Sequence, residues 1–447
     1  MTGLTMEGDT LINRLRSVPV ATVTGRVASI NGLLLEATGI KLPVGQLCRI
    51  RSRSGGEFDA EVVGFNKKQS FLMSLSTHQE GLAPGDLIIP AASNKSVPID
   101  SGLIGRVIDA MGQPLDNQPL VVNERIPVLP HPINPMHRRA VDTPQYVGIR
   151  AIDGLLTLGQ GQRVGLLAGS GVGKSTLLGM MTRNTQADVT VVGLIGERSR
   201  EVKEFVENTL GAEGMARTIV VAAPGDESPV RRIRAASYCH RIAEYFRDQG
   251  KSVLLLMDSL TRYAQAHREV ALAMGEAPAS RGFPPSVFSK IPILLERSGT
   301  GTGNGAITAV YTVLADGDDL MDPIVDSARS VLDGHIVLSR ELAEKGHYPA
   351  IDLDKSISRV MPQVVDERQR ENAGHFRRYY ARYNQFQELM AIGAYQAGAD
   401  PELDRAIELR PSMEQFLQQS RFEQVNPEDS TQLLNRMMVR KEVLTHG

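Results

Sequence analysis

A glycine-rich stretch near the middle of the chain has the residue types of a loop that binds phosphate. Residues 168–176 read Ala-Gly-Ser-Gly-Val-Gly-Lys-Ser-Thr and directly follow an apolar run at 164–167. Glycines let the backbone curl around phosphate oxygens, so that its N–H groups and a helix N-terminus point at the negative charge. In such a loop Lys174 neutralises the β- and γ-phosphates, and the hydroxyl of Ser175 coordinates Mg²⁺.

This stretch predicts a nucleoside triphosphate site. The strict pattern begins with glycine, whereas this chain has Ala168, which we expect to end the strand and not to line the phosphate cavity. The alternative is an ordinary glycine-rich turn, which requires neither the strand before the glycines nor the Lys-Ser-Thr after them. The expected nucleotide-binding residues are Gly169, Ser170, Gly171, Val172, Gly173, Lys174, Ser175 and Thr176.

A carboxylate follows a second apolar run, as Mg²⁺ binding next to such a loop requires. Residues 253–257 are Val-Leu-Leu-Leu-Met, and Asp258 comes next. An acidic residue at the carboxyl end of a buried strand holds Mg²⁺ through its water shell. The alternative role for Asp258 is the N-cap of a helix that starts at 259–261. The phosphate-binding loop favours the metal role.

Hydrolysis also needs a group that activates water, and Glu197 stands where one is expected. The apolar run 189–195 leads directly into Gly-Glu-Arg-Ser-Arg-Glu at 196–201. Ligands of α/β folds bind at the carboxyl edge of the sheet, where Glu197 would emerge. Glu197 would accept a proton from water, with Arg198 orienting it or stabilising charge. As an isolated pattern this stretch is also compatible with a solvated charge cluster.

Composition points to a globular protein without a nucleic-acid signature. The chain has 447 residues, 42% of them hydrophobic, and a formal net charge of −2, so we expect no nucleic acid as partner. Cys48 and Cys239 show no metal-ligand spacing and are expected in the core of a protein from a reducing compartment. Acidic Glu7 and Asp9 stand where a secretory signal carries basic residues, which favours the cytoplasm.

The pattern along the chain predicts an α/β protein with four segments. Residues 1–20 read as an amphipathic helix, with Leu11, Leu15 and Val18 on one side, that either docks a partner or acidic lipid or packs on its own domain. Short β-rich runs in 21–95 predict a small β-barrel. In 96–365 a proline-rich linker, 96–148, precedes strands that alternate with helices, as in a RecA-like parallel sheet.

The last segment, 366–447, is expected to be helical. Its aromatic and apolar residues recur at helical spacing and predict one buried helix face. The residues of that predicted face are Tyr379, Tyr383, Phe386 and Met390.

Several stretches resemble the rotary ATP synthase catalytic-subunit superfamily. They are Gly-Ser-Gly-Val-Gly-Lys-Ser-Thr at 169–176, Gly-Glu-Arg-Ser-Arg-Glu at 196–201, Met-Asp-Ser-Leu-Thr-Arg-Tyr at 257–263 and the run 348–359. Within that superfamily the chain is most similar to the flagellar protein-export ATPases, which are sisters of the type III secretion ATPases. This narrower resemblance is carried by residues 153–163, 192–198, 243–250, 281–286 and 332–340.

The resemblance implies roles that spacing alone does not assign. Glu197 falls on the family's catalytic glutamate, and Lys174, Ser175 and Asp258 fall on its phosphate and Mg²⁺ ligands. Arg359 falls on the arginine that reaches into the site of a neighbouring subunit, where it would stabilise charge on the γ-phosphate. Tyr348 falls where the family stacks an aromatic ring on adenine, the alternative being a core tyrosine.

The implied assembly is a homohexameric Mg²⁺-dependent ATPase ring, peripheral to an inner-membrane export apparatus. Implied partners are a stator-like regulatory protein at the N-terminal helix, a coiled-coil stalk protein in the pore, export chaperone–substrate complexes at the C-terminal helices, and the membrane export gate. The glycine-rich loop 298–305 is either a mobile loop near the pore or a disordered hairpin tip. Both interpretations make it flexible.

Three other functions compete with flagellar export. An injectisome ATPase would have the same chemistry and another cargo. A non-catalytic ring subunit would lack a carboxylate at the position of Glu197, which is present here. An RNA translocase of the termination-factor type shares the fold, and it predicts turnover stimulated by nucleic acid.

Overall fold

The computed structural model describes residues 23–77, 80–91, 96–128, 132–314 and 322–438. The predicted N-terminal helix, 1–20, lies outside these residues. Internal contacts divide the described chain into two compact units. The first holds the residues up to Ser96 together with Leu272–Glu276, and the second holds the remainder.

The first unit is a closed six-stranded barrel, which confirms the predicted β-barrel. Its strands are β1 (Gly25–Asn31), β2 (Leu34–Thr38), β3 (Leu47–Arg51), β4 (Glu57–Phe65), β5 (Ser70–Ser74) and β6 (Leu87–Pro90). They pair in the order β1-β2-β5-β4-β3-β6. Gly32 has φ +58° in the two-residue turn between β1 and β2, a left-handed conformation that glycine adopts without strain. Cys48 is buried inside the barrel, where burial raises the pKa of its thiol to about 11.

A largely parallel sheet forms the centre of the second unit. Its strands are β8 (Val107–Ile108), β12 (Arg163–Ala168), β13 (Val189–Ile195), β14 (Thr218–Ala223), β15 (Ser252–Asp258), β16 (Gly299–Thr300), β17 (Ala306–Leu314), β18 (Gly334–Leu338) and β19 (Ile351–Ser358). The order is β19-β18-β12-β17-β15-β13-β14-β8, and β16 pairs with β17 beside this path. Among the described strands of this sheet, only β16 and β19 run antiparallel to their neighbours.

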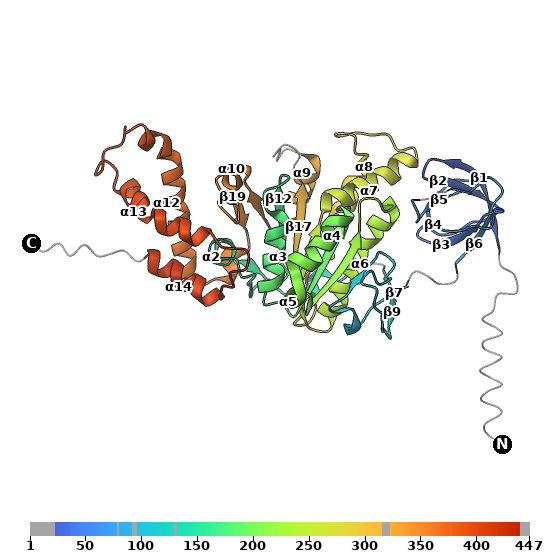
Figure 1. Cartoon of the computed structure of the whole chain (residues 1–447), viewed down its shortest axis with the longest axis horizontal. Helices are drawn as coiled ribbons and strands as arrows, with labels where there is room; N and C mark the ends of the chain where they lie inside the picture. The colour runs from blue at the N-terminus through green and yellow to red at the C-terminus, as the bar shows by residue number, and fades with distance from the viewer. Residues whose placement is uncertain (1–22, 78–79, 92–95, 129–131, 315–321, 439–447) are drawn as a thin grey trace, which may run out of the picture. The chain divides into compact units, whose positions relative to one another are not determined.

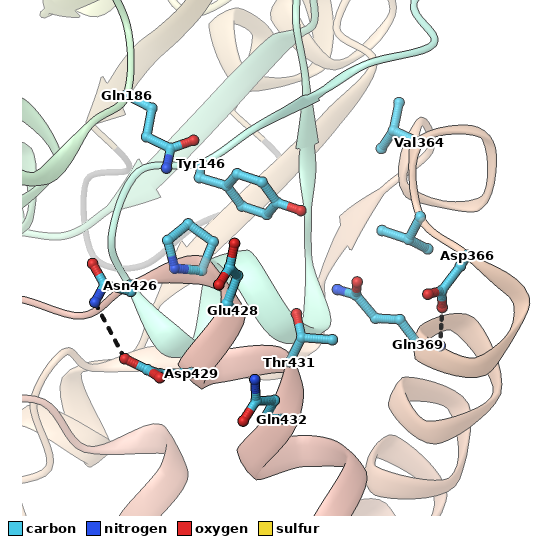
Figure 2. A pocket seen from close by; sticks show the side chains of 12 residues that line it. Tyr146, Gln186, Val364, Asp366, Gln369, Asn426, Glu428, Asp429, Thr431 and Gln432 are labelled. Atoms are coloured by element: carbon cyan, nitrogen blue, oxygen red, sulfur yellow. Dashed lines mark hydrogen bonds between the residues drawn. The ribbon is translucent and has the colours of Figure 1, made fainter.

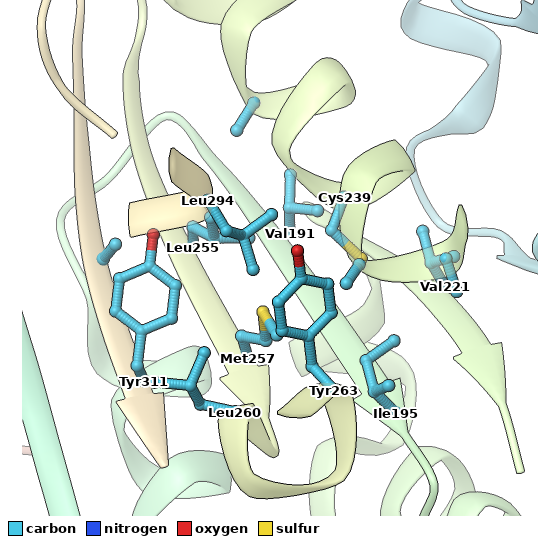
Figure 3. Close-up of a cluster of buried hydrophobic side chains, with 14 of the residues drawn as sticks. Val191, Ile195, Val221, Cys239, Leu255, Met257, Leu260, Tyr263, Leu294 and Tyr311 are labelled. Atoms are coloured by element: carbon cyan, nitrogen blue, oxygen red, sulfur yellow. The ribbon is translucent and has the colours of Figure 1, made fainter. Parts of the chain in front are cut away.

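Helices cover both faces of this sheet (Figure 1). One face carries α3 (Lys174–Asn184), α4 (Ser199–Glu204), the π-helix η3 (Phe205–Leu210) and α5 (Gly211–Met215). The other carries α6 (Pro229–Asp248), α7 (Leu260–Ala273), α8 (Pro285–Leu295) and α9 (Pro323–Arg329). Because side chains alternate along a strand, Leu255 faces the second group while Leu254 and Leu256 face the first. Figure 3 shows Val191 and Leu255 of the sheet packed among Cys239 of α6 and Leu294 of α8.

Short elements connect these parts. They are β7 (Ser96–Pro98), η1 (Ser101–Leu103), β9 (Arg125–Pro127), η2 (Pro135–His137), β10 (Pro144–Gln145), α2 (Arg150–Leu155), β11 (Leu158–Gly159), α10 (Arg340–Glu344) and α11 (Met361–Val364). Two pairs among them form two-stranded sheets, β7 with β9 and β10 with β11. None of the helices in the described ranges is both long and apolar enough to span a bilayer.

Three helices end the described chain and pack on α2. They are α12 (Glu367–Ala391), α13 (Pro401–Leu417) and α14 (Pro427–Met438), drawn in red in Figure 1. A Cβ atom on Gly154 would lie 2.8 Å from the ring of Phe416, so glycine at this position lets α13 approach α2 closely. Gln369 adds hydrogen bonds from α12 to the carbonyl of Asp153 and the hydroxyl of Thr157.

The predicted buried face of α12 was wrong. Tyr379, Tyr383, Phe386 and Met390 are only half-buried. The buried residues of this helix are Gln369, Ala373, Phe376 and Tyr380. Two of the predicted aromatics instead contact arginines, with Arg410 lying 4.4 Å from the ring centre of Tyr383 and Arg382 lying 4.5 Å from that of Phe386. Stacked guanidinium groups cover these rings while the helix face stays accessible to water.

Hydrogen bonds connect the glycine-rich loop 298–305 to the linker and close its turn. Arg138 donates a hydrogen bond to the carbonyl of Ser298, and Thr300 donates one to the carbonyl of Arg139. The N–H of Gly301 bonds the carbonyl of Gly305, which closes the turn before β17. The loop therefore packs against the linker at the amino end of β17, and residues 302–304 are its exposed tip.

Candidate active site

The phosphate-binding loop lies between β12 and α3, as the sequence predicts. Gly171 has φ +79° and Gly173 has φ +92°, a left-handed conformation that favours glycine. α3 begins at Lys174, so the N–H groups of its first turn are free of intrahelical partners and available to phosphate oxygens. Val172 is buried and anchors the loop, whereas Ser170, Gly171, Ser175 and Thr176 are exposed. This is a cradle open to a ligand.

Lys174 connects the three strand ends that meet at this edge of the sheet. Its Nζ lies 2.6 Å from Oδ1 of Asp258 and 3.2 Å from Oε1 of Glu197. Asp258 ends β15, and Glu197 stands two residues after β13. Burial alone would lower the pKa of the Lys174 ammonium, but the two carboxylates outweigh burial and raise it. Lys174 is therefore held charged between two acceptors.

Glu197 has the environment of a carboxylate with increased basicity. Burial raises the pKa of its carboxyl, and the charge of Asp258 and a side-chain hydrogen bond with Glu201 raise it further, whereas Lys174 lowers it. The net shift is upward. Increased basicity suits a group that must take a proton from water. The backbone of Glu197 is fixed by its carbonyl, which accepts the N–H of Gly225 at 2.9 Å.

Arg198 does not orient Glu197 in the structure. Its guanidinium pairs with Glu201 at 3.0 Å, and its side chain is 81% exposed. Glu197 is positioned by Lys174 instead. The exposed Arg198 is available to groups outside this chain.

Asp258 is held from two sides. Its Oδ1 accepts a hydrogen bond from Lys174 and a second, at 2.6 Å, from the hydroxyl of Thr312 on β17. Asp258 is only 3% exposed, so this carboxylate is fixed at the bottom of the site. Thr312 has no local sequence signal, because its contact depends on β17 lying next to β15 in the sheet.

The oxygen ligands present at this edge fit Mg²⁺. The ion prefers hydroxyl, carboxylate, phosphate and water oxygens, and it usually keeps several waters. Ser175 supplies an exposed hydroxyl in the first turn of α3, and Asp258 supplies a carboxylate. Across the described residues there is no cluster of three or more His, Cys, Asp or Glu side chains that would hold a metal alone. The residues thus fit an ion that is completed by substrate phosphates.

Tyr348 lies over the phosphate-binding loop. A Cβ atom built on Gly173 would be 3.5 Å from Cδ1 and Cε1 of the Tyr348 ring. The ring is 46% exposed, so it is not a core tyrosine. Its backbone carbonyl accepts the N–H of Gln419, which ties it to the segment that follows α13.

Arg359 stands at the opposite edge of the sheet. Arg359 follows Ser358, which pairs with Gly334 at the start of β18. The phosphate-binding loop follows β12, whose last residues pair with the end of β18. At roughly 3.3 Å per residue, the length of β18 alone separates the two edges by about 13 Å. Arg359 is exposed, and its backbone N–H bonds the carbonyl of Asp333. Within one chain the structure does not bring Arg359 to Lys174.

Two protein families match consecutive parts of this chain. The ATP synthase alpha/beta family, nucleotide-binding domain, matches residues 148–358, and the T3SS EscN ATPase C-terminal domain matches residues 365–436. A flagellum-specific ATP synthase of Pseudomonas aeruginosa is 54% identical over 93% of this chain and 92% of its own length. The chain belongs to the flagellum-specific and type III secretion ATPase family. As a member of that family it is an ATPase, and its substrate is ATP.

Two solved structures extend the similarity to the whole fold of this ATPase. One is the assembled ATPase EscN from the type III secretion system of enteropathogenic E. coli, with 42% identity and a TM-score of 0.87. The other is assembled EscN in complex with its central stalk EscO, with 41% identity and a TM-score of 0.85. Each covers 93% of this chain and 100% of the solved chain.

Arg262 of the ATPase packs against the glycine that precedes Glu197, a contact that the sequence analysis did not predict. A Cβ atom on Gly196 would lie 2.7 Å from Cβ of Arg262, so glycine before Glu197 allows the start of α7 to pack against the end of β13. The guanidinium of Arg262 donates a hydrogen bond to Gln265 at 2.9 Å, and its Nε is buried without a hydrogen-bond partner among the described residues. The sequence signal was available, since Arg262 belongs to the stretch 257–263 that carries the family resemblance.

Two cavities of the ATPase differ in their relation to the site. One of about 220 Å³ adjoins the phosphate-binding loop and is lined by Ala168, Gly169, Ser339, Arg340, Asp352 and Lys355, among others. The other, of about 650 Å³, lies between Tyr146 and the first turns of α12 and α14 (Figure 2). Asp366, Glu428 and Asp429 make it acidic, and no residue of the phosphate-binding loop lines it. The acidic lining makes this larger cavity unfavourable for an anionic phosphate.

Proposed function

We propose that this ATPase hydrolyses ATP with Mg²⁺ and thereby assists export of unfolded flagellar proteins through a flagellar type III secretion apparatus. One observation carries the chemistry, the contact of Lys174 with both Glu197 and Asp258 beside an open phosphate cradle. The flagellar assignment is supported by the higher identity to the flagellum-specific relative, 54%, than to EscN, 42%. An injectisome ATPase is the runner-up.

The residues divide the reaction between them. The N–H groups of the loop and the Lys174 ammonium bind the phosphates. Ser175 and Asp258 would hold Mg²⁺, which would neutralise charge on the phosphate oxygens. A phosphate in the loop competes with Glu197 for the Lys174 ammonium. This competition frees Oε1 of Glu197. Glu197 then accepts the proton of the attacking water.

Arg359 completes the site of a neighbouring subunit in a homohexameric ring. This role is supported by its exposure at the edge of the sheet away from its own phosphate-binding loop. An arginine supplied by another chain makes turnover depend on assembly. Arg198, exposed beside Glu197, is a second candidate for charge stabilisation at that interface.

The remaining partners and the location are inferred by analogy with the family. EscN is assembled with a central stalk, so we infer a coiled-coil stalk in the pore of this ring. A stator-like regulator at the N-terminal segment, chaperone–substrate complexes at α12–α14 and a membrane export gate complete the proposed assembly. The ring would work in the cytoplasm, peripherally attached to the inner-membrane apparatus.

A steady-state measurement of phosphate release tests the proposal. We expect release from ATP that requires Mg²⁺, stops with EDTA and rises in specific activity with protein concentration as the ring assembles. Single-stranded RNA should leave the rate unchanged, since stimulation by RNA would support an RNA translocase. Absence of turnover at every concentration would support a non-catalytic ring subunit. Flagellar genes beside this one, in place of virulence genes, would separate the two export systems.

Replacing Tyr348 by alanine should raise the KM for ATP and leave kcat nearly unchanged. An aromatic stack contributes roughly 0.5–1.5 kcal/mol, so the expected rise is about 2- to 13-fold. Steady-state kinetics of Tyr348→Ala and Tyr348→Phe provide the check. Tyr348→Phe keeps the ring and should retain the wild-type KM, whereas an equal rise in both variants would contradict stacking on the base.

A further inference from the structure

Thr312 is a buried polar side chain in the middle of the sheet that the proposed chemistry has not yet used. It lies on β17, where it pairs with Leu166 of β12, and the preceding residue, Tyr311, pairs with Met257 of β15. β12 leads into the phosphate-binding loop, and β15 ends in Asp258. Thr312 therefore stands between the two strands that supply the phosphate and metal ligands, and it is fully buried.

The contacts of Thr312 single out one oxygen of Asp258. The Thr312 hydroxyl lies 2.6 Å from Oδ1 of Asp258 and 3.4 Å from the carbonyl of Met257. A hydroxyl has one proton, and the shorter contact has the length of a charge-assisted O–H···O⁻ bond. Lys174 also donates to Oδ1. Within the described ranges, each hydrogen bond to this carboxylate falls on Oδ1 and none on Oδ2.

We propose that Thr312 is a positioning residue for Asp258. By holding Oδ1 it prevents rotation of the carboxylate and keeps Oδ2 available to the water shell of Mg²⁺. When a phosphate takes Lys174 away from Asp258, the Thr312 hydroxyl is the hydrogen bond that keeps Oδ1 in place. This proposal rests on the Mg²⁺ role of Asp258 proposed above.

Thr190 is a second buried threonine of the sheet, and its hydroxyl does not contact Asp258. Thr190 on β13 is fully buried, and its hydroxyl has no hydrogen-bond partner among the described residues. It lies near the start of its strand, whereas Asp258 ends its own strand at the opposite edge of the sheet. Thr190→Val is therefore a matched control, because it makes the same substitution in the same sheet without touching Asp258.

Calorimetric titration of the full chain with ADP, once with Mg²⁺ and once with EDTA, tests the proposal. The quantity of interest is the gain in ADP affinity that Mg²⁺ provides. In Thr312→Val we expect this gain to fall about tenfold, since a hydrogen bond to a charged group is lost. The affinity measured in EDTA should stay at the wild-type value. Thr312→Ser keeps the hydroxyl and should restore the gain, and Thr190→Val should behave as wild type in both titrations.

Two results would overturn the proposal. One is a full Mg²⁺-dependent gain in Thr312→Val, and the other is an equal loss of affinity with Mg²⁺ and with EDTA, which is what a purely structural role predicts. Thermal unfolding identifies a variant that has lost its fold, and Thr312→Ala then replaces Thr312→Val. An absence of any gain in the wild-type protein would instead refute the Mg²⁺ role of Asp258, and that failure is recognised before any substitution is made.

Discussion

Glu197→Gln is expected to reduce kcat for ATP hydrolysis by about 10²- to 10⁴-fold, the usual contribution of a general base. Glutamine is nearly isosteric but cannot take a proton from water. It still accepts a hydrogen bond from Lys174, which lies 3.2 Å from Oε1 in the wild-type protein. ATP binding should therefore survive, with a dissociation constant near that of the wild type. Phosphate release and binding of a fluorescent ATP analogue measure the two effects separately.

The control for Glu197→Gln is Glu204→Gln. Glu204 is an exposed carboxylate at the end of α4, on the segment that follows Glu197. The control removes one negative charge from the same region without touching Lys174, and it should keep wild-type turnover. Appreciable hydrolysis by Glu197→Gln, or equal losses of kcat in both variants, would show that Glu197 is not the catalytic base.

The chemistry at the carboxyl edge could be predicted because its signals are local. β12, the glycine-rich loop and the start of α3 are contiguous, so the residue order itself predicts their arrangement. Glu197 and Asp258 each follow an apolar strand, and parallel strands bring their carboxyl ends to one edge. The structure brings both carboxylates to Lys174 by this rule.

Thr312 could not be predicted because its contact depends on strand order. β17 is inserted between β12 and β15, although it follows both in the sequence. No local pattern encodes that insertion, so a threonine in an apolar strand reads as part of the core. The pairing of Arg198 with Glu201 is similarly a choice among charged neighbours, which residue spacing does not resolve.

Helical periodicity predicted the wrong face of α12 as the buried one. Two sets of large side chains share helical spacing on this helix, one running through Phe376 and Tyr380 and the other through Tyr379 and Tyr383. Periodicity predicts that one set is buried but does not say which. The contact of Phe376 with Phe416 of α13 decides it, with ring centres 5.5 Å apart. That tertiary contact is invisible in the local sequence.

Arg359→Ala is expected to lower kcat by about 10³- to 10⁵-fold, the usual contribution of an arginine finger. The exposed position of Arg359, away from the phosphate-binding loop of its own chain, implies that the loss occurs in the adjacent site. The affinity for ATP should change far less, because Lys174 and the loop still bind the phosphates. Arg378→Ala removes an exposed arginine of α12 and should leave turnover unchanged.

Mixing two inactive variants separates a shared site from one within a single chain. A subunit carrying Arg359→Ala keeps Glu197, and a subunit carrying Glu197→Gln keeps Arg359. In a randomly assorted ring about one quarter of the interfaces combine an intact Glu197 with an intact neighbouring Arg359. An equimolar mixture should therefore regain turnover that neither variant shows alone, and the regain should grow with protein concentration. A mixture as inactive as its components would place Arg359 and Glu197 in the same chain's site, and the shared-site ring would have to be abandoned.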